Sequence, residues 1–378
     1  MTNVLRTLNA ADIRRKRYRR TSNERMTTRF FLTCALVLGC VASSGAQTAP
    51  APSPAPPAAE PDYPIIRVGV LSYVQYDAEL KNRDAFSAFD LTRAYVNVNG
   101  QLAKNVRFRF TPDVRRVTDS SLAGSLVLRV KYAFVELDNI TAARSWVRFG
   151  AHQTPWLDFE ESINRYRVQG TMFSEREALI PGSSDFGVGY FTPLGKYIDI
   201  QTGVYNGEGY TQTDVNKYKS AQGRLTLRPF AGRGVANGLR LSGFYNAGWY
   251  AANRPRRLGI VMGSFEHTNV VATLQYLKAT ENPNAAAPRD IDRNGSSGFV
   301  EIRQGVNGWA ALARVDRLDP DRALSSNSQR RVIAGGAYWF VWPRSRVGLV
   351  VTNEQVHYDP AAARPQENRL LVQTHIEF

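Results

Sequence analysis

Hydrophobic side chains alternate with polar ones in short segments from residue 65 to the C-terminus. In one segment Val106, Phe108 and Phe110 alternate with Arg107 and Arg109. Successive side chains of a β-strand point to opposite faces, so this period of two predicts strands, and almost no segment shows the period of an α-helix. The alternation therefore predicts an all-β fold whose strands have one apolar face and one polar, often basic, face.

The alternating segments number about sixteen, an even number such as outer-membrane barrels require. The predicted strands cover residues 65–77, 88–99, 105–116, 125–138, 145–153, 184–192, 197–206, 220–230, 237–250, 257–266, 269–280, 296–304, 308–317, 328–342, 345–355 and 368–378. Long connections such as 154–183 tend to follow odd-numbered strands, and short ones such as 304–307 tend to follow even-numbered strands. Long external loops opposite short periplasmic turns predict a transmembrane antiparallel β-barrel of about 16 strands.

Aromatic residues at the predicted strand ends support this orientation, because amphipathic rings favour the interfaces of a membrane. Outward-facing aromatics are predicted at the periplasmic ends for Phe134, Phe340, Trp342 and Phe378, and at the opposite ends for Tyr76 and Tyr276. The last strand places Leu370, Val372, Thr374, Ile376 and Phe378 on one face, and the chain stops on Phe378. This ending resembles the signal that the barrel-assembly machinery recognises, which makes that machinery an expected partner.

Residues 1–46 form a predicted leader with a secretory signal peptide. A basic segment precedes the apolar run 30–42, and small residues lead to an expected cleavage after Ala46. Met26 is an alternative start that leaves a signal of normal length. Residues 47–64 are rich in Pro and Ala and predict an extended spacer, and residues 65–378 hold the predicted barrel.

The leader also accounts for two features of the composition. Cys34 and Cys40 both lie in it, so a mature chain would carry no disulfide, thiolate metal site or cysteine nucleophile. The formal charge is +15, of which +7 belongs to residues 1–29 and +8 to the remainder. An exported chain without cysteine indicates the cell envelope of a Gram-negative bacterium and excludes nucleic acid as a partner.

The polar faces of the predicted strands carry cations that would line the lumen of a barrel. The predicted pore-lining, anion-binding residues are Arg93, Arg107, Arg109, Arg129, Lys131, Arg148, Arg224, Arg228 and Arg314. A row of guanidinium groups would raise the local concentration of anions, and the planar fork of arginine suits phosphate or carboxylate. These cations could equally be ordinary lumenal charge paired with Asp113, Asp199, Asp316 or an acidic loop, and the sequence leaves both readings open.

Several short motifs, in order, resemble the phosphate-selective porin family of the O and P types. They lie at residues 89–95, 100–102, 107–109, 149–156, 160–161, 173–176, 185–189, 204–209 and 312–319. The resemblance covers most of residues 65–378 and implies a sixteen-stranded, trimeric, water-filled pore that is often anion-selective. It also implies that the long third external loop, residues 154–183, folds into the pore.

The predicted constriction loop departs from an anion pore of this family because it is net acidic. Its charged residues are Asp158, Glu160, Glu161, Arg165, Arg167, Glu175, Arg176 and Glu177. An acidic loop opposite a basic wall would create a transverse field, as in a general porin. The acidic charge of this loop therefore leaves the selection of phosphate by the pore an open question at the level of sequence.

Other chemistries find weaker support, and no metal or cofactor is predicted. Asp290, Asp292, Asn294 and Glu301 match the spacing of a calcium-binding loop, but the flanking prolines and the strand-like segment after it favour a surface loop. The sequence lacks the common hydrolase, zinc-protease and nucleotide-binding motifs. His152, on a predicted lumenal face, is the one histidine worth testing for catalysis.

The sequence therefore predicts a passive outer-membrane diffusion channel for small hydrophilic solutes, anion-preferring and with phosphate as a candidate. Its expected partners are outer-membrane lipid, two further copies of the chain in a homotrimer, and small anionic or polar solutes. Two alternatives remain: an outer-membrane barrel with an enzymatic or structural role, and a soluble secreted β-sandwich that acts as a binding module.

Overall fold

The computed structural model describes residues 61–82, 85–117, 121–284 and 289–378. The chain divides into two units, Met1–Asp62 and Tyr63–Phe378. The predicted leader and most of the predicted spacer lie outside the described residues. The second unit contains all the strands of the described residues.

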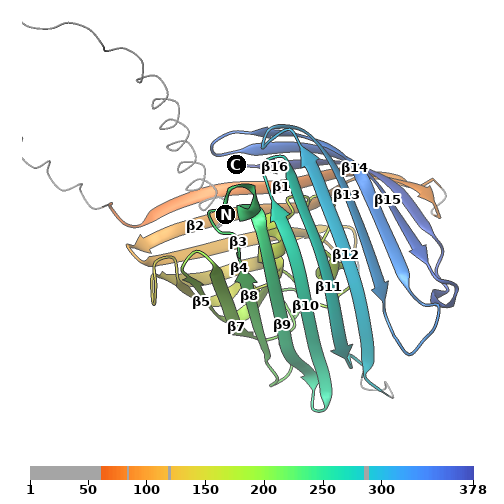
Figure 1. Cartoon of the computed structure of the whole chain (residues 1–378), viewed down its shortest axis with the longest axis horizontal. Coiled ribbons are helices and arrows are strands. Elements are labelled where there is room, and N and C mark those ends of the chain that lie inside the picture. The colour runs from red at the N-terminus through yellow and green to blue at the C-terminus, as the bar shows by residue number, and fades with distance from the viewer. Residues whose placement is uncertain (1–60, 83–84, 118–120, 285–288) are drawn as a thin grey trace, which may run out of the picture. The chain divides into compact units, whose positions relative to one another are not determined.

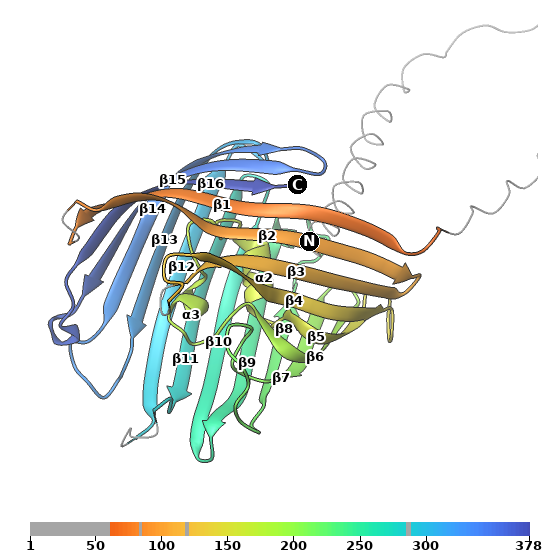
Figure 2. The same ribbon diagram turned by 180° about the vertical axis from the view of Figure 1, so that it is seen from behind.

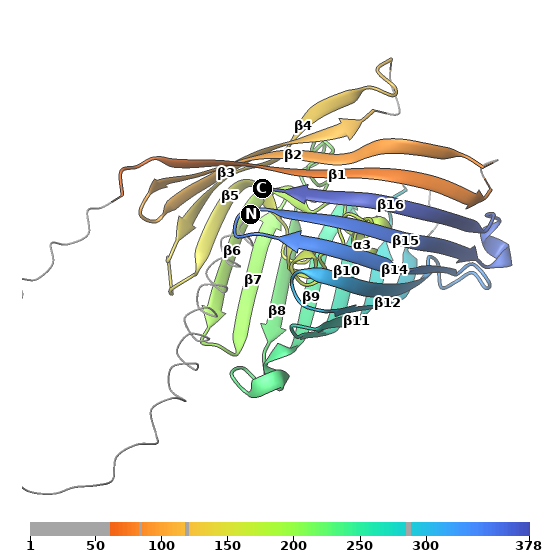
Figure 3. The same ribbon diagram turned by 90° about the horizontal axis from the view of Figure 1, so that it is seen from above.

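The second unit is a closed antiparallel barrel of sixteen strands in chain order, in which β1 pairs with both β2 and β16 (Figures 1 and 3). The strands are β1 (Ile65–Lys81), β2 (Ser87–Ala103), β3 (Val106–Arg116), β4 (Leu126–Asp138), β5 (Trp146–Gln153), β6 (Ser184–Leu194), β7 (Ile198–Tyr205), β8 (Ser220–Leu227), β9 (Leu239–Ala251), β10 (Arg254–Glu266), β11 (Val270–Glu281), β12 (Ile291–Arg303), β13 (Gly308–Asp319), β14 (Gln329–Val341), β15 (Arg346–Tyr358) and β16 (Glu367–Glu377). The predicted sixteen-stranded barrel is confirmed, and the β-sandwich alternative is wrong because one closed sheet contains every strand of the described residues.

The strands alternate between an inner and an outer face as the sequence period predicts. On β11 Leu274 is 70% exposed on the outer face, whereas Leu277 is fully buried on the inner face. The outer face is apolar on most strands. The inner face is charged on β2–β5 but also apolar on β9–β15, where it holds Leu258, Ile260 and Met262. The second half of the barrel thus carries apolar side chains on both faces, beside charged ones on the inner face of β12–β15, and the connection between β5 and β6 covers the inner face.

A β-bulge corrects the predicted orientation of part of β4. The register between β3 and β4 shifts at Thr111, so that Lys131 has no direct partner, and both Lys131 and Tyr132 are buried on the inner side. One extra residue reverses the face of every side chain that follows. Phe134 therefore points inward against His152, and its predicted place in an outer aromatic ring is wrong. The predicted outer aromatics Phe340, Trp342 and Phe378 are exposed.

The lengths of most connections follow the predicted asymmetry, and the clearest exceptions are the two connections that adjoin β9. The β9–β10 connection is only residues 252–253, because β10 begins at Arg254, earlier than predicted. On the opposite rim the β8–β9 connection is long and contains the 3-10 helix η1 (Gly234–Gly238). The longest connection is residues 154–183, which joins β5 to β6.

Gly150 offers a test of the backbone geometry that joins β4 to β5. Its φ is +118°, and a Cβ there would lie 2.3 Å from the carbonyl oxygen of Ala133. We expect Gly150→Ala to destabilise the folded barrel by about 1–3 kcal/mol, because both the backbone conformation and the close approach exclude a side chain. The measurement is the urea midpoint of the shift in gel migration between folded and heat-denatured protein.

The matched control for this prediction is Gly243→Ala on β9. A Cβ at Gly243 meets nothing within 4 Å, and its φ is not in the left-handed region. The control should unfold at the urea concentration of the parent protein. Equal midpoints for the two variants would contradict the assignment of strain to Gly150.

Candidate pore constriction

Residues 154–183 fold into the barrel. This segment, which we call the constriction loop, contains the short helices α2 (Leu157–Ile163) and α3 (Phe173–Arg176), both drawn between opposite walls in Figure 2. Its prediction as a long third external loop folded into the pore is confirmed by the contacts that it makes with strands across the barrel.

One side of the constriction loop is apolar and covers the apolar inner wall of β9–β15. Trp156 is fully buried and packs on Phe244 of β9, with ring centroids 5.6 Å apart. Further along the loop, Tyr166 packs against Phe299 of β12 and Trp339 of β14, at 6.1 Å and 5.8 Å. Burial of these rings explains why the inner wall is apolar here, since a water-filled lumen would otherwise face it.

Polar contacts fasten the same loop to the wall. Arg165 donates a hydrogen bond to Glu301 of β12 at 2.8 Å, and the Tyr166 hydroxyl donates to the same carboxylate at 2.8 Å. Gln373 of β16 donates to the carbonyl oxygen of Val168 at 2.7 Å. The loop therefore crosses the lumen from β5 and β6 and is held by strands on the far side.

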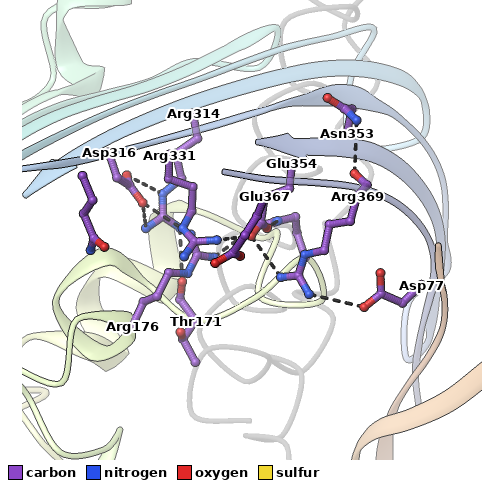
Figure 4. A network of polar contacts seen from close by, with 12 residues as sticks. Asp77, Thr171, Arg176, Arg314, Asp316, Arg331, Asn353, Glu354, Glu367 and Arg369 are labelled. Atoms are coloured by element: carbon purple, nitrogen blue, oxygen red, sulfur yellow. Dashed lines mark hydrogen bonds and ion pairs between the residues drawn. The ribbon is translucent and has the colours of Figure 1, made fainter. Parts of the chain in front are cut away.

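Figure 4 shows a denser network around α3. Arg314 of β13 pairs with Asp316 at 2.8 Å and donates to the carbonyl oxygen of Thr171 at 3.2 Å. Arg176 of α3 reaches the same Asp316 at 3.4 Å. Burial lowers the pKa of Arg176 to about 9, which still leaves the guanidinium charged at neutral pH.

The network continues through Glu354 of β15, a buried carboxylate. It accepts hydrogen bonds from Arg331 and from Arg369 at 3.0 Å (Figure 4). It also accepts one from Gln169 of the constriction loop at 2.7 Å. Arg369 also pairs with Asp77 of β1 at 3.3 Å. Glu354 of β15 thus links the constriction loop to β14 and β16. Arg369 of β16 extends this link to β1, the strand that closes the barrel.

Glu160 of α2 occupies an unusual place in this arrangement. It is buried, and it accepts hydrogen bonds from Trp156 at 3.0 Å and from Gln275 of β11 at 2.6 Å. Burial raises the pKa of Glu160 to about 7. The nearby charge of Arg314 favours the ionised carboxylate, whereas the charge of Asp316 disfavours it. Glu160 therefore titrates near neutral pH while it holds α2 against the wall.

The structure separates the predicted loop charges into two groups. Those that fasten the loop to the wall are Glu160, Arg165, Arg176 and Glu177. The second group consists of Asp158, Glu161, Arg167 and Glu175. In it Arg167 pairs with Glu161 at 2.9 Å and with Glu175 at 2.8 Å. The net charge of the second group is negative.

The nine predicted lumenal cations also separate into two groups. Those paired with carboxylates are Arg107, Arg129, Arg148, Arg224, Arg228 and Arg314. Arg129 lies 2.9 Å from Asp113, for example, and Arg224 lies 2.8 Å from Asp199. For these six, the sequence-based alternative of ordinary lumenal charge paired with carboxylates describes what the structure shows, and the partner carboxylates neutralise their charge.

The other three cations, which we call the basic wall, are Arg93, Arg109 and Lys131 on the neighbouring strands β2, β3 and β4. Within the described ranges of the chain, none of them forms an ion pair. Arg109 donates to Asn97 at 2.8 Å, and Lys131 donates to the Tyr95 hydroxyl at 2.5 Å. The hydrogen-bond acceptors of Arg109 and Lys131 are therefore neutral groups, and no carboxylate of the described residues pairs directly with the basic wall.

The basic wall lies near the acidic group of the constriction loop. Lys131 is close enough to Glu161 and Arg167 to interact with them electrostatically, and Arg109 is close enough to Asp158. A solute that passes between the loop and the strands β2–β4 would meet opposite charges on its two sides.

Sequence reasoning missed three tyrosines in this region. The Tyr132 ring lies 4.2 Å from the Arg109 guanidinium, and Tyr95 and Tyr210 lie 4.5 Å and 5.7 Å from the Lys131 ammonium. Electron-rich ring faces stabilise buried cations without neutralising them. Tyr95 could have been found by its parity, which it shares with the predicted lumenal cation two residues before it. Tyr132 could not, because the bulge at Lys131 reverses its face.

The surroundings of His152 do not resemble a catalytic centre. Its Nδ1 lies 3.0 Å from the carbonyl oxygen of Gln153. Its cross-strand neighbour Asp185 accepts backbone N–H groups of Phe186 and Gly207, each at 2.7 Å. In the part of the chain that the structure describes, the imidazole has no hydrogen bond to a serine or a carboxylate, so no nucleophile–base pair forms around it.

The segment that matches a calcium-binding loop is a strand instead. Asp292, Asn294 and Glu301 all lie in β12, and Asp290 precedes it. At about 3.3 Å per residue, Asp292 and Glu301 are roughly 30 Å apart and cannot share an ion. The surface loop that the sequence favoured for residues 291–295 is therefore wrong, because pairing with β11 and β13 extends the segment, and the calcium-binding spacing brings no ligands together. Residues 61–82, 85–117, 121–284 and 289–378 contain no group of three or more metal-ligating side chains.

The sequence matches no protein-family model and no curated protein. Its structure, however, is similar to solved outer-membrane barrels. The anion-selective porin of Comamonas acidovorans superposes with a TM-score of 0.58 at 12% identity, covering 84% of this chain and 100% of that one. The chain has the porin fold.

Two further structures agree. The trimer form of OmpT of Vibrio cholerae gives a TM-score of 0.55 at 12% identity, with 84% and 100% of the two chains covered. The outer membrane channel DcaP of Acinetobacter baumannii gives 0.56 at 12% identity, with 83% and 97% covered. No helix among the described residues is both long enough and apolar enough to cross a membrane.

Glu160 generates a prediction about pH. In the docked loop Glu160 keeps its proton up to about pH 7, whereas in a detached loop it would lose the proton near pH 4.5. The docked state therefore binds more protons between these two pH values. Docking should weaken as the pH rises through this window, by about 3 kcal/mol in total. We expect more open-channel current noise at pH 8 than at pH 5, and Glu160→Gln should remove the difference.

Glu161→Gln is the matched control, because Glu161 is the next residue of α2 and pairs with Arg167 instead of with the wall. This variant should keep the pH dependence of the parent protein. Noise that rises with pH to the same extent in Glu160→Gln would show that another group titrates.

Proposed function

We propose that the chain is a passive diffusion channel of a bacterial outer membrane for small hydrophilic solutes. One observation carries the proposal: a closed sixteen-stranded barrel with an apolar outer face encloses a charged inner face, and a tethered loop narrows its interior. An apolar belt outside and charge inside are what a membrane pore requires. Porins and a channel among the similar solved structures support it.

Three related expectations belong to the same proposal. The leader at residues 1–46 would direct export, and β16 followed by Phe378 would present the signal for the barrel-assembly machinery. A homotrimer would be the assembled form, in keeping with the trimer form of the similar OmpT. The remaining alternative, an outer-membrane barrel with an enzymatic or structural role, would leave the purified protein unable to conduct ions.

The finer part of the proposal is that the channel prefers anions. The basic wall supports it, because Arg93, Arg109 and Lys131 form no ion pair with a carboxylate of the described residues. Phosphate is a candidate solute because two of the three are arginines, whose planar donors match oxygen pairs. The acidic group of the constriction loop would oppose a strong preference and would orient dipolar solutes across the pore.

Planar lipid bilayers test the channel itself. The purified trimer should insert in discrete conductance steps that scale with the salt concentration, as a water-filled pore requires. Protein that migrates as a folded barrel in gels yet gives no steps at any voltage would overturn the proposal and favour an enzymatic or structural role.

The basic wall generates a prediction about selectivity. In the double variant R93Q/K131Q, the ratio of chloride to potassium permeability from reversal potentials should fall by roughly tenfold or more. Each charge at about 4 Å from an ion in water contributes about 1 kcal/mol, a factor of about five. K196Q/K217Q, which removes two exposed lysines from connections outside the constriction, is the matched control and should keep the parent ratio.

Phosphate is tested separately on the same protein. Added inorganic phosphate should reduce the chloride current of the parent channel at low millimolar concentration and should reduce that of R93Q/K131Q much less. If phosphate has no effect on either protein while the selectivity change is present, the channel prefers anions without a phosphate site.

A further inference from the structure

Five basic side chains lie on the outer face of the barrel, near the ends of five of the six consecutive strands β10–β15. They are Arg257 on β10, Lys278 on β11, Arg317 on β13, Arg330 on β14 and His357 on β15, and we call them the outer basic patch. All five are exposed, whereas the residues directly beside Lys278, Arg317 and His357 in the sequence are buried on the inner face. The patch is therefore not part of the lumen and does not belong to the constriction.

The strand register brings three of these side chains into one row. Arg317 is the direct cross-strand partner of Arg330, and Arg330 is the direct partner of His357. Directly opposed like charges destabilise a sheet, since their Cβ atoms are only about 5 Å apart. A negative charge placed beside these two arginines would remove this repulsion.

The described part of the chain does not supply that charge, since none of the five residues forms an ion pair there. Two carboxylates share the face, but both have other partners: Asp292 accepts the Thr280 hydroxyl at 2.7 Å, and Asp319 accepts the backbone N–H of Asp321 at 3.2 Å. Arg116, an exposed arginine of β3 near the same rim, shows the contrast, because it pairs with Asp90.

The patch lies at a defined height on the wall. It occupies the rim of the long connections, since Arg317 is two residues from the end of β13 and Arg330 is the second residue of β14. Tyr276 of β11 pairs with Ser296 of β12, which pairs with Arg317 of β13, so the tyrosine lies at the same height as Arg317. Outward-facing apolar residues such as Val315 lie closer to the middle of the wall. Exposed tyrosine above an apolar belt marks the headgroup level of a membrane.

We propose that the outer basic patch binds the phosphate groups of an anionic lipid headgroup in the outer leaflet. Two neighbouring arginines can each direct a planar fork at one phosphate, which removes their mutual repulsion. Lys278 lies two strands from Arg317 and is offset from it by two residues, which together amount to about 12 Å, so it and Arg257 would reach a second phosphate. A lipid whose headgroup carries two phosphates on a saccharide matches this spacing.

Native mass spectrometry of the detergent-solubilised trimer tests the proposal, with bisphosphoryl lipid A as the probe. A cation beside an anionic lipid surface contributes about a fivefold factor to affinity. R317Q/R330Q should therefore bind this lipid roughly 25-fold more weakly than the parent protein. The matched control K196Q/K217Q, which has the same change of charge, should stay within about twofold.

Two more variants keep the outcome decisive. R317K/R330K retains the charge and should retain most of the binding. R257Q/K278Q, on two other strands, should also weaken binding, and it replaces R317Q/R330Q if that variant does not fold. Gel migration of unheated samples reports folding. The conductance of R317Q/R330Q should equal that of the parent, since the patch lies outside the pore, so this test is independent of the proposed channel.

Three results would overturn the proposal. One is equal affinity of R317Q/R330Q and the parent for bisphosphoryl lipid A. Another is that the parent protein binds lipid A without its two phosphates as tightly as it binds bisphosphoryl lipid A. The third is dissociation of the trimer in R317Q/R330Q with unchanged lipid binding, which would assign the patch to a contact between copies of the chain.

Discussion

The closing ladder between β1 and β16 is the interaction on which the rest of the structure depends. Val70 and Phe378 exchange backbone hydrogen bonds of 2.8 Å and 3.1 Å, and the two strands stay paired from Leu71 to Lys81. A strand with unpaired N–H and C=O groups cannot face lipid, so closure is what allows this sheet an apolar outer surface. Closure also creates an interior that all the charged residues of the inner face share. Whether such a residue is neutralised then depends on which side chains lie next to it across the strands.

The constriction loop divides that interior unequally. It lies on the inner wall of β9–β15, where Trp156 and Tyr166 cover apolar side chains, and it is held there by buried carboxylates such as Glu301 and Glu354. The opposite wall, β2–β4, keeps its charges and its tyrosines. One half of the barrel therefore anchors the loop, whereas the other half keeps a charged inner face. The outer face is also unequal, because the outer basic patch lies on β10–β15.

Local irregularities explain where sequence reasoning about the site failed. The extra residue at Lys131 moves Tyr132 and Phe134 to the inner face, against a strictly alternating pattern, because a period of two carries no sign of a bulge until the partner strand is known. The surface loop predicted before residue 296 is wrong for a similar reason. Asp292 and Glu301 have the spacing of metal ligands in sequence, but pairing with two neighbouring strands extends the segment and separates them.

By itself the sequence determined the class of fold, because side-chain alternation is a local property that each strand carries in its own residues. The sixteen strands, their order and the inward loop could all be predicted from it and from family resemblance. Only the tertiary structure decided which lumenal cations are neutralised. Arg129 and Lys131 have the same parity and charge in the sequence, yet one has Asp113 as a neighbour and the other has Tyr95. Pairing across strands depends on register, and register is a property of the closed barrel as a whole.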